Sequence, residues 1–293
     1  MFSTVGVVAR VGSDLVRDST LAVVTTLRAR KVGVVVETAT ATMLGNPAGI
    51  SAVARAELGL RSDLVVVIGG DGSLLGVARD LCHAGKPVVG VNRGGLGFLA
   101  GISPEVIDAE LNRVLDGEFA SEDHFLLHAE TMRGTAAAGG SLALNDVVVH
   151  AGGVSHMLEF SVYVNDEWVY DQRGDGLIIA SPTGSTAYSL SAGGPIMHPS
   201  LNAIAIVPMF PHTLTSRPLV VSGDSEIRVV IKNAGSTQPK ASCDSQVHLD
   251  LTSIDVLRIR KHPASLRMLF PIGHSFYGSC RSKLDWATRL GGG

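Results

Sequence analysis

A glycine-rich loop in the first quarter of the chain has the residue types of a phosphate-binding site. The apolar run Val65–Ile68 continues directly into Gly69-Gly70-Asp71-Gly72-Ser73, and apolar residues at helical spacing follow. A strand, a glycine turn and a helix N-terminus together present backbone N–H groups and a positive dipole end to an anion. Glycine also lets the backbone approach the anion closely. The loop therefore predicts a phosphate site.

Asp71 lies in the middle of this loop, where a carboxylate repels a bound phosphate unless it has a role of its own. It could coordinate a metal ion or accept a proton from an attacking hydroxyl, and a phosphoryl-transfer site needs both roles. The loop contains no Lys, so it is not the Walker A motif. The alternative is a tight structural turn in which Asp71 is simply the first residue of the helix.

Small residues dominate a stretch in the second half of the chain, Ser181–Pro195, which follows the strand-like segment Asp175–Ala180. Hydroxyl side chains, Gly and Ala surround one aromatic residue, Tyr188. Such residues let a flat ligand approach closely and satisfy its polar edges. A flexible linker is the alternative. The apolar strands on both sides and the helical run Ser185–Ala192 favour a ligand platform.

A second glycine motif, Gly95–Ala100, fits the dinucleotide fingerprint G-x-G-x-x-A but lacks its context. The next predicted helix begins only at Pro104, and no acidic residue closes a second strand about 20 residues further on. We therefore predict a loop that brings Asn92 and Phe98 to the carboxyl ends of the strands. Phe98 could equally belong to the core.

The first third of the chain alternates strand and helix patterns. The predicted strands are Val5–Ala9, Lys31–Glu37, Asp63–Ile68 and Pro87–Asn92, and the predicted helices are Asp14–Arg30, Ser73–Cys82 and Pro104–Leu115. Strands that alternate with helices predict a doubly wound, Rossmann-like α/β domain built on a parallel sheet.

From about Ser121 the pattern changes to short, β-branched strands with little helical periodicity. The predicted strands are Leu142–His150, Leu158–Asn165, Gly176–Ser181, Leu219–Val221, Ile227–Lys232, Ala241–Leu251 and Val256–Arg260. This pattern predicts an all-β sandwich. We expect an α/β domain over residues 1–120 and a β-sandwich over residues 121–270. The C-terminal residues 271–293 are expected to pack back on the first domain.

Composition excludes several other classes of protein. The net charge is −3, with 24 basic and 27 acidic residues, which gives no electrostatic footprint for nucleic acid or an anionic membrane. Three widely spaced Cys residues fit a reducing compartment rather than a disulfide scaffold. Apolar runs are too short to span a bilayer, and the first residues lack a signal-peptide pattern. We therefore expect a cytoplasmic protein.

The stretch Asp175–Pro195 resembles the signature of NAD kinases and is the most specific motif in the chain. The resemblance extends to Gly69–Gly72, Asn92–Leu99, Asn145–Asp146, Pro211–Pro218 and Lys283–Trp286. The combination of His156–Phe160, Gln172-Arg173 and Cys243–Gln246 is similar to the proteobacterial branch of that family.

The resemblance implies a role for individual residues. It makes Asp71 the catalytic carboxylate that accepts the proton of the adenosine 2′-hydroxyl, and it places Gly69, Gly70 and Gly72 against phosphate. It implies that Asn145 and Asp146 bind the adenosine ribose, although Asp146 stands where the family usually has the longer Glu. The other positions that match NAD-contacting residues are Phe98, His156, Arg173, Asp175, Thr186, Ala187, Tyr188, Ser189, Leu190, Ser191 and Gln246.

The resemblance also implies ATP as phosphoryl donor, NAD as acceptor and a divalent metal, Mg²⁺ or Mn²⁺, with ligands left unassigned. It implies small-molecule nucleotides as partners, without nucleic acid or membrane, and a homo-oligomer, either dimer or tetramer. Two alternatives stay open. A lipid or sugar kinase would share the Gly-Gly-Asp-Gly loop but leaves Asp175–Pro195 unexplained. A non-catalytic dinucleotide sensor would be expected to have lost Asp71 or Asn145, and both are present.

Overall fold

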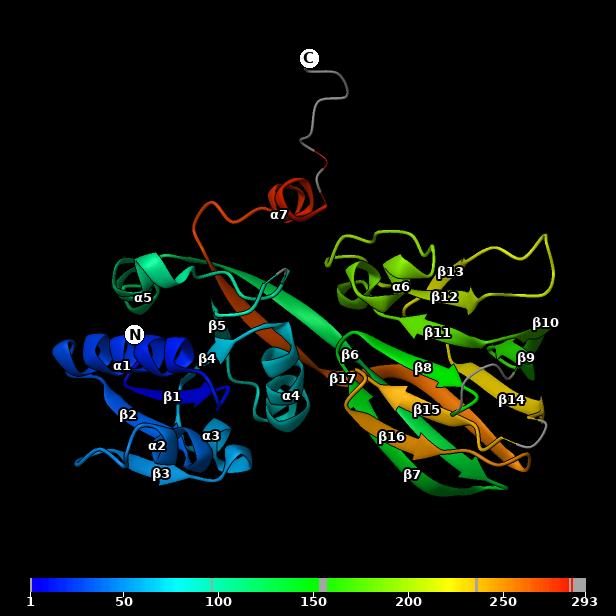
Figure 1. Ribbon diagram of the computed structural model, residues 1–293, viewed down its shortest axis with the longest axis horizontal. Coiled ribbons are helices and arrows are strands. Elements are labelled where there is room, and N and C mark those ends of the chain that lie inside the picture. Colours follow the sequence, from blue (N-terminus) through cyan, green and yellow to red (C-terminus); the bar gives the residue numbers. More distant parts are fainter. Residues whose placement is uncertain (1, 96, 153–156, 235–236, 285, 287–293) are drawn as a thin grey trace, which may run out of the picture. The chain divides into compact units, whose positions relative to one another are not determined.

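A computed structural model describes residues 2–95, 97–152, 157–234, 237–284 and 286. The chain divides into two compact units, Met1–Asp123 with Leu266–Gly293, and His124–Ser265. Two long strands, β6 (Phe119–Arg133) and β17 (Asp255–Pro271), each carry the chain across the boundary between the units (Figure 1). The first unit is therefore built from both ends of the chain.

The first unit is organised around a parallel sheet. Its strands are β1 (Thr4–Ala9), β2 (Gly33–Glu37), β3 (Ser51–Val53), β4 (Leu64–Gly69) and β5 (Val88–Asn92). They lie in the order β5-β4-β1-β2-β3, and the end of β17 continues the sheet beside β5 through Met268 and Leu269. Along the chain, β2 and β3 follow β1 on one side of it, and β4 and β5 then lie on its other side. The order of the strands therefore reverses between β1 and β4.

Helices cover both faces of this sheet, as a doubly wound fold requires. The helices of this unit are α1 (Asp14–Ala29), α2 (Thr38–Met43), α3 (Arg55–Arg61), α4 (Asp71–Leu81), α5 (Ile107–Leu115) and α7 (Phe276–Lys283). Val5 and Val7 share a core with Leu27 of α1 and Leu111 of α5. Gly6 points to the other face, where an added Cβ would lie 3.1 Å from Leu58 of α3.

The predicted strands and helices of this unit are confirmed, with two differences. The predicted helix Pro104–Leu115 begins with a 3-10 turn, Pro104–Val106, before α5. The elements α2, β3 and α3 were not predicted, because each buries only one or two residues and so leaves little apolar pattern in the sequence. None of the described helices is long and apolar enough to cross a membrane.

The second unit is an antiparallel β-sandwich, as predicted. One layer is a six-stranded sheet in the order β13-β12-β11-β8-β15-β16. Its strands are β8 (Asp146–His150), β11 (Gly176–Ala180), β12 (Ala203–Met209), β13 (Leu219–Ser222), β15 (Lys240–Cys243) and β16 (Val247–Asp250). The other layer contains β7 (Ala136–Ala143), β9 (Leu158–Val164), β10 (Glu167–Gly174) and β14 (Ile227–Asn233) with parts of β6 and β17.

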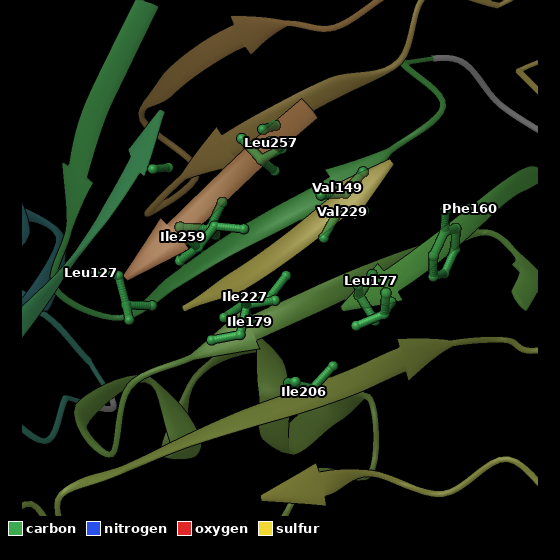
Figure 2. Packing of buried hydrophobic residues seen from close by; sticks show 14 of the residues in the cluster. Leu127, Val149, Phe160, Leu177, Ile179, Ile206, Ile227, Val229, Leu257 and Ile259 are labelled. Carbon is green, nitrogen blue, oxygen red and sulfur yellow. The ribbon is translucent and has the colours of Figure 1, made fainter. Parts of the chain in front are cut away.

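The two layers bury a mainly aliphatic core between them (Figure 2). Ile227 and Val229 of β14 point into it, whereas Arg228 between them does not, so the period-2 alternation in the sequence is confirmed. The facing layer contributes Leu177 and Ile179 of β11 to the same core. Close packing of branched side chains from both sheets holds the sandwich together.

Two segments predicted as single strands are broken by turns. Leu142–His150 is divided at Leu144-Asn145 between β7 and β8. Ala241–Leu251 forms the hairpin β15–β16, because Asp244 and Ser245 adopt the left-handed conformation with φ of +52° and +55°. Two adjacent left-handed residues match the right-handed twist of a hairpin. Both breaks lie at the candidate site described next.

Candidate active site

The first unit has a pocket at the point where its strand order reverses. Arg10 follows β1 and the glycine loop follows β4, so both lie at the carboxyl ends of neighbouring parallel strands. Parallel sheets bind ligands at this place because the loops diverge and leave a crevice. The pocket has a volume of about 280 Å³ and is lined by Arg10, Gly70, Gly72 and Ser73. Its lining combines a guanidinium with the N-terminus of α4, which suits an anion.

Close packing accounts for Gly69 in the loop and for Gly94, which lies against it. A Cβ on Gly69 would lie 2.4 Å from the Ser73 hydroxyl, and a Cβ on Gly94 would lie 2.8 Å from the Cα of Gly70. The amide of Ser73 donates to the carbonyl of Gly70 at 3.0 Å, which closes the first turn of α4. Side chains at Gly69 or Gly94 would therefore push the loop out of place.

Asp71 is the first residue of α4, and its carboxylate is held by the second glycine motif. The amide of Phe98 donates to Oδ2 at 2.6 Å and the amide of Leu99 donates to Oδ1 at 3.1 Å. A Cβ on Gly97 would lie 2.5 Å from Oδ1, so only glycine fits there. The motif that resembles a dinucleotide fingerprint is thus a loop that orients Asp71, and it places Phe98 beside that carboxylate.

The second unit brings Asn145 and Asp146 together with a second carboxylate, Asp244. Asp244 accepts hydrogen bonds from the backbone amides of Leu144 at 3.0 Å, Asn145 at 2.8 Å and Asp146 at 3.4 Å. Its own amide donates to the carbonyl of Asp146 at 2.9 Å. These bonds tie the turn before β8 to the left-handed turn of the β15–β16 hairpin.

Asp146 has an unusual electrostatic environment. Its side chain is only 3% exposed. Burial, together with the negative charge of Asp244, raises the pKa of Asp146 from 3.8 to about 7. A buried carboxyl group with this pKa changes its charge near neutral pH. A perturbed carboxyl group of this kind is typical of a functional site rather than of a structural turn.

The small-residue stretch packs directly on Asn145. The amide of Ser181 donates to the carbonyl of Asn145 at 2.9 Å, and the Ser181 hydroxyl donates to the carbonyl of Leu144 at 2.5 Å. A Cβ on Gly184 would lie 2.0 Å from the Asn145 carbonyl oxygen, so the backbones touch. The stretch is therefore ordered structure and not a linker.

The chain around Gly184 forms a 3-10 turn, Thr183–Thr186, and then the short helix α6 (Tyr188–Ser191). Thr186, Ala187 and Leu190 are half-buried, Tyr188 and Ser191 are exposed, and Ser189 is buried. Tyr188 is 44% exposed, a high value for a large aromatic residue, so its ring is available to a ligand.

Some predicted residues lie away from this cluster. Asp175 precedes β11, whereas Ser181 and its Asn145 contact follow the other end of that strand. The six residue steps from Asp175 to Ser181 separate them by roughly 20 Å at about 3.3 Å per residue. Arg173 lies two residues before Asp175 on β10, and its carbonyl accepts from the amide of His212 at 2.9 Å. The structure therefore does not bring Arg173 and Asp175 together with Asn145 and Asp146 within one chain.

Gln246 lies in the hairpin turn that carries Asp244, and its side chain is exposed. His156 lies outside the described residues. Two site residues were not predicted individually from the sequence. Arg10 was missed because its only signal is its place after a buried strand. Asp244 was recognised only within a family motif, since its contacts to Leu144–Asp146 span about 100 positions.

No group of three or more His, Cys, Asp or Glu side chains among the described residues is arranged to hold a metal ion. Asp71 is the first residue of α4, next to the residues that line the pocket. Mg²⁺ in kinases is usually held by one or two carboxylates and by substrate phosphates. The residues present therefore fit a metal that enters with a nucleotide.

A parallel sheet with a pocket at a helix N-terminus, joined to a β-sandwich with an ordered small-residue stretch, is the architecture expected of a nucleotide-binding phosphotransferase. Family models identify it: that of the ATP-NAD kinase N-terminal domain matches residues 5–119, and that of the C-terminal domain matches residues 144–269. The chain belongs to the ATP-NAD kinase family.

Relatives of the whole chain agree with these matches. An NAD kinase of Pseudomonas paraeruginosa is 47% identical over 292 residues, covering 100% of this chain and 99% of the relative. An NAD kinase of Chromohalobacter salexigens is 47% identical over 290 residues, covering 99% of each. The predicted family and the predicted NAD kinase activity are thus confirmed. The lipid or sugar kinase and the non-catalytic sensor are not favoured.

Solved structures share the fold. A yeast NADH kinase complexed with NADH has a TM-score of 0.88 at 24% identity, covering 99% of this chain and 90% of that chain. An NAD kinase from Archaeoglobus fulgidus in complex with ATP has a TM-score of 0.76 at 23% identity, covering 96% and 98%. The likeness to both neighbours, together with the α/β unit and the β unit of this chain, confirms the predicted fold class.

Proposed function

We propose that the protein transfers the γ-phosphoryl group of ATP to the 2′-hydroxyl of the adenosine ribose of NAD, with Asp71 as proton acceptor. One observation carries this assignment. Asp71 lies at the N-terminus of α4 between Gly70 and Gly72, which line the pocket, and two backbone amides fix its carboxylate. A carboxylate next to a phosphate-binding loop would only repel an anion that is simply bound there. In phosphoryl transfer the same carboxylate can accept the proton of the attacking hydroxyl.

In this reaction the 2′-hydroxyl oxygen forms a bond to the γ-phosphorus as the bond from that phosphorus to the bridging oxygen of ADP breaks. The proton of the hydroxyl passes to Asp71. A carboxylate is a weak base, so its main contribution is to orient the hydroxyl and to take the proton late. The Phe98 and Leu99 amides support this role because they hold both carboxylate oxygens in a fixed direction.

Arg10 and the amides of Gly70 and Gly72 are the proposed phosphate contacts, with Gly69 giving the loop its close packing. A divalent metal, Mg²⁺ or Mn²⁺, would supply neutralisation of the phosphate charge. We propose that it enters bound to ATP, because this requires few ligands from the chain.

Asn145 and Asp146 are proposed to bind the ribose of NAD, and the platform from Thr186 to Ser191 is proposed to bind its flat rings. Asp146 is suited to a ribose hydroxyl because a buried carboxylate gains more from a hydrogen bond than an exposed one. Gln246 shares the hairpin turn of Asp244 and is proposed to contact the same ligand. The family resemblance also assigns His156 to NAD binding and Phe98 to the adenine.

Arg173 and Asp175 support the proposal of a homo-oligomer. Both match NAD-contacting positions, but β11 separates them from Asn145 and Asp146 of the same chain. They would therefore contact NAD bound to another copy. We propose a homodimer or homotetramer acting on small nucleotides in the cytoplasm, assembled through the β-sandwich unit. Sedimentation velocity of the wild type would test this, and a monomer at micromolar concentration with full activity would contradict it.

The central experiment is a coupled assay. Purified protein is incubated with NAD, ATP and Mg²⁺, and the product is detected with an NADP-specific dehydrogenase by absorbance. A metal-dependent signal that Asp71→Asn abolishes would support the proposed reaction. Bound NAD without any product would contradict the proposed activity.

A further inference from the structure

The glycine loop places a negative side chain, Asp71, beside the pocket for a highly charged nucleotide, and it contains no Lys of its own. A site of this kind needs cations to offset repulsion among the carboxylate and the phosphates. Arg10 lines the pocket and supplies one. The first unit contains a second basic residue near Asp71, contributed by the end of the chain.

Lys283 is the last residue of α7, and its ammonium lies over the ring of Phe98, 5.3 Å from the ring centroid. Phe98 is the residue whose amide donates to Asp71 at 2.6 Å. Burial lowers the pKa of Lys283, and the negative charge of Asp71 acts in the opposite direction. Lys283 is therefore half-buried, and its ammonium is attracted by the negative charge of Asp71. The same ammonium lies over an aromatic ring of the loop that orients Asp71.

A purely structural role for Lys283 would be an interaction with the helix dipole, which basic residues in the last turn of a helix make. Arg281 lies in the same last turn and is exposed. Both residues can make that interaction, whereas the contact with Phe98 and the attraction to Asp71 belong to Lys283. Arg281 is therefore a matched control for the helix-dipole effect.

We propose that Lys283 is a positioning residue for phosphoryl transfer, which holds the Phe98 loop and offsets the charge of Asp71 when ATP phosphates arrive. This inference rests on the proposed NAD phosphorylation and assigns the C-terminal helix a part in it. A cation over an aromatic ring is attracted by the ring quadrupole, which fixes the ring and the ammonium relative to each other. Fixing the ring also fixes the adjoining amide that points at Asp71.

The test compares wild type, Lys283→Met, Lys283→Arg and Arg281→Met in the coupled assay, with kcat and both KM values and the melting temperature measured. Lys283→Met is expected to lower kcat about 10- to 100-fold, because it removes a charge that offsets Asp71 and the ring contact that holds the Phe98 loop. The KM for NAD and the melting temperature should change little. Lys283→Arg keeps the charge and the stacking and should recover most of the rate.

Equal kinetics for Lys283→Met and Arg281→Met would overturn the inference while leaving the proposed function intact. A loss shared by Lys283→Met and Lys283→Arg, together with a lower melting temperature, would show that Lys283 only stabilises α7. Phe98→Leu is introduced into the wild type and into Lys283→Met, so that the loss of kcat in the double variant can be compared with the two single losses. If the losses are additive as free energies, Lys283 does not act through Phe98. An inactive wild type would overturn the proposed function and this inference with it.

Discussion

Replacing Asp146 by Asn is expected to make the protein more stable at pH 8 while weakening its binding of NAD. Asp146 is 3% exposed and lies beside Asp244, and both features disfavour its ionised form. Asn has nearly the same shape and no charge. The substitution therefore removes an unfavourable buried charge, and with it the carboxylate proposed to bind the ribose.

The size of the effect follows from the pKa. Folding raises the pKa of Asp146 from 3.8 to about 7. A tenfold change in proton affinity corresponds to about 1.4 kcal/mol, so the ionised carboxylate would cost up to about 4 kcal/mol above pH 7. Relaxation of the protein around the charge reduces such costs. We therefore expect Asp146→Asn to raise the free energy of unfolding at pH 8 by about 2 kcal/mol. That gain corresponds to a melting temperature about 4–8 °C higher.

The direction of the pH dependence follows from the raised pKa. The folded protein binds a proton at Asp146 more tightly than the unfolded chain does. Its stability therefore falls as pH rises from 3.8 to about 7 and is constant with respect to this group above that range. Asp146→Asn should lack this part of the pH dependence. Its advantage over wild type should be clearly smaller at pH 5 and reach its full size at pH 8.

The assay is thermal unfolding of wild type and Asp146→Asn at pH 5, 6, 7 and 8, with NAD binding measured by calorimetry at pH 8. Asp250→Asn is the control. Asp250 has an exposed side chain that pairs with Lys240 at 3.4 Å, so its loss should change stability little at any pH. A gain for Asp146→Asn that is equal at pH 5 and pH 8 would refute the electrostatic explanation. A lower melting temperature at pH 8 would refute it as well.

The phosphate side of the site supports three more predictions. Asp71→Asn should lower kcat by roughly 10²–10⁴ with NAD binding largely retained, and near-normal turnover would exclude Asp71 as the proton acceptor. Arg10→Gln should raise the KM for ATP about tenfold with little change in the KM for NAD, as measured in the coupled assay; an unchanged KM for ATP would remove Arg10 from the phosphate site. Gly97→Ala should lower kcat about as far as Asp71→Asn, because its Cβ would collide with the Asp71 carboxylate at 2.5 Å, and circular dichroism would show whether the fold is retained.

Local patterns in the sequence predicted most of the fold. The continuous apolar run Val65–Ile68 and the alternation in Ile227–Lys232 each depend only on neighbouring residues, and both strands form as expected. The short elements between Thr38 and Arg61 were missed because they bury few residues each. The breaks at Asn145 and Asp244 were missed because adjacent apolar residues hid turns that long-range hydrogen bonds stabilise.

A site residue could be predicted where its chemical role and its position both follow from one short segment of the sequence. Asp71 stands out because a carboxylate interrupts a glycine loop between a strand and a helix. Arg10, Asp244 and Lys283 have no such local signal. Each comes near its partners only because the fold joins distant segments. For Arg10 these are β1 and β4, for Asp244 the paired strands β8 and β15, and for Lys283 the returning C-terminal segment.

The split construction of the first unit has a consequence for how the protein is made. During synthesis, the residues of the second unit, His124–Ser265, leave the ribosome before Leu266 and the residues that follow it. Until then Val88 and Val89 of β5 have no strand beside them on the side that Met268 and Leu269 later occupy. An unpaired edge rich in Val can pair with other chains. The second unit is thus expected to complete its folding first, and the first unit passes through an aggregation-prone stage that ends when the last residues of β17 pair with β5.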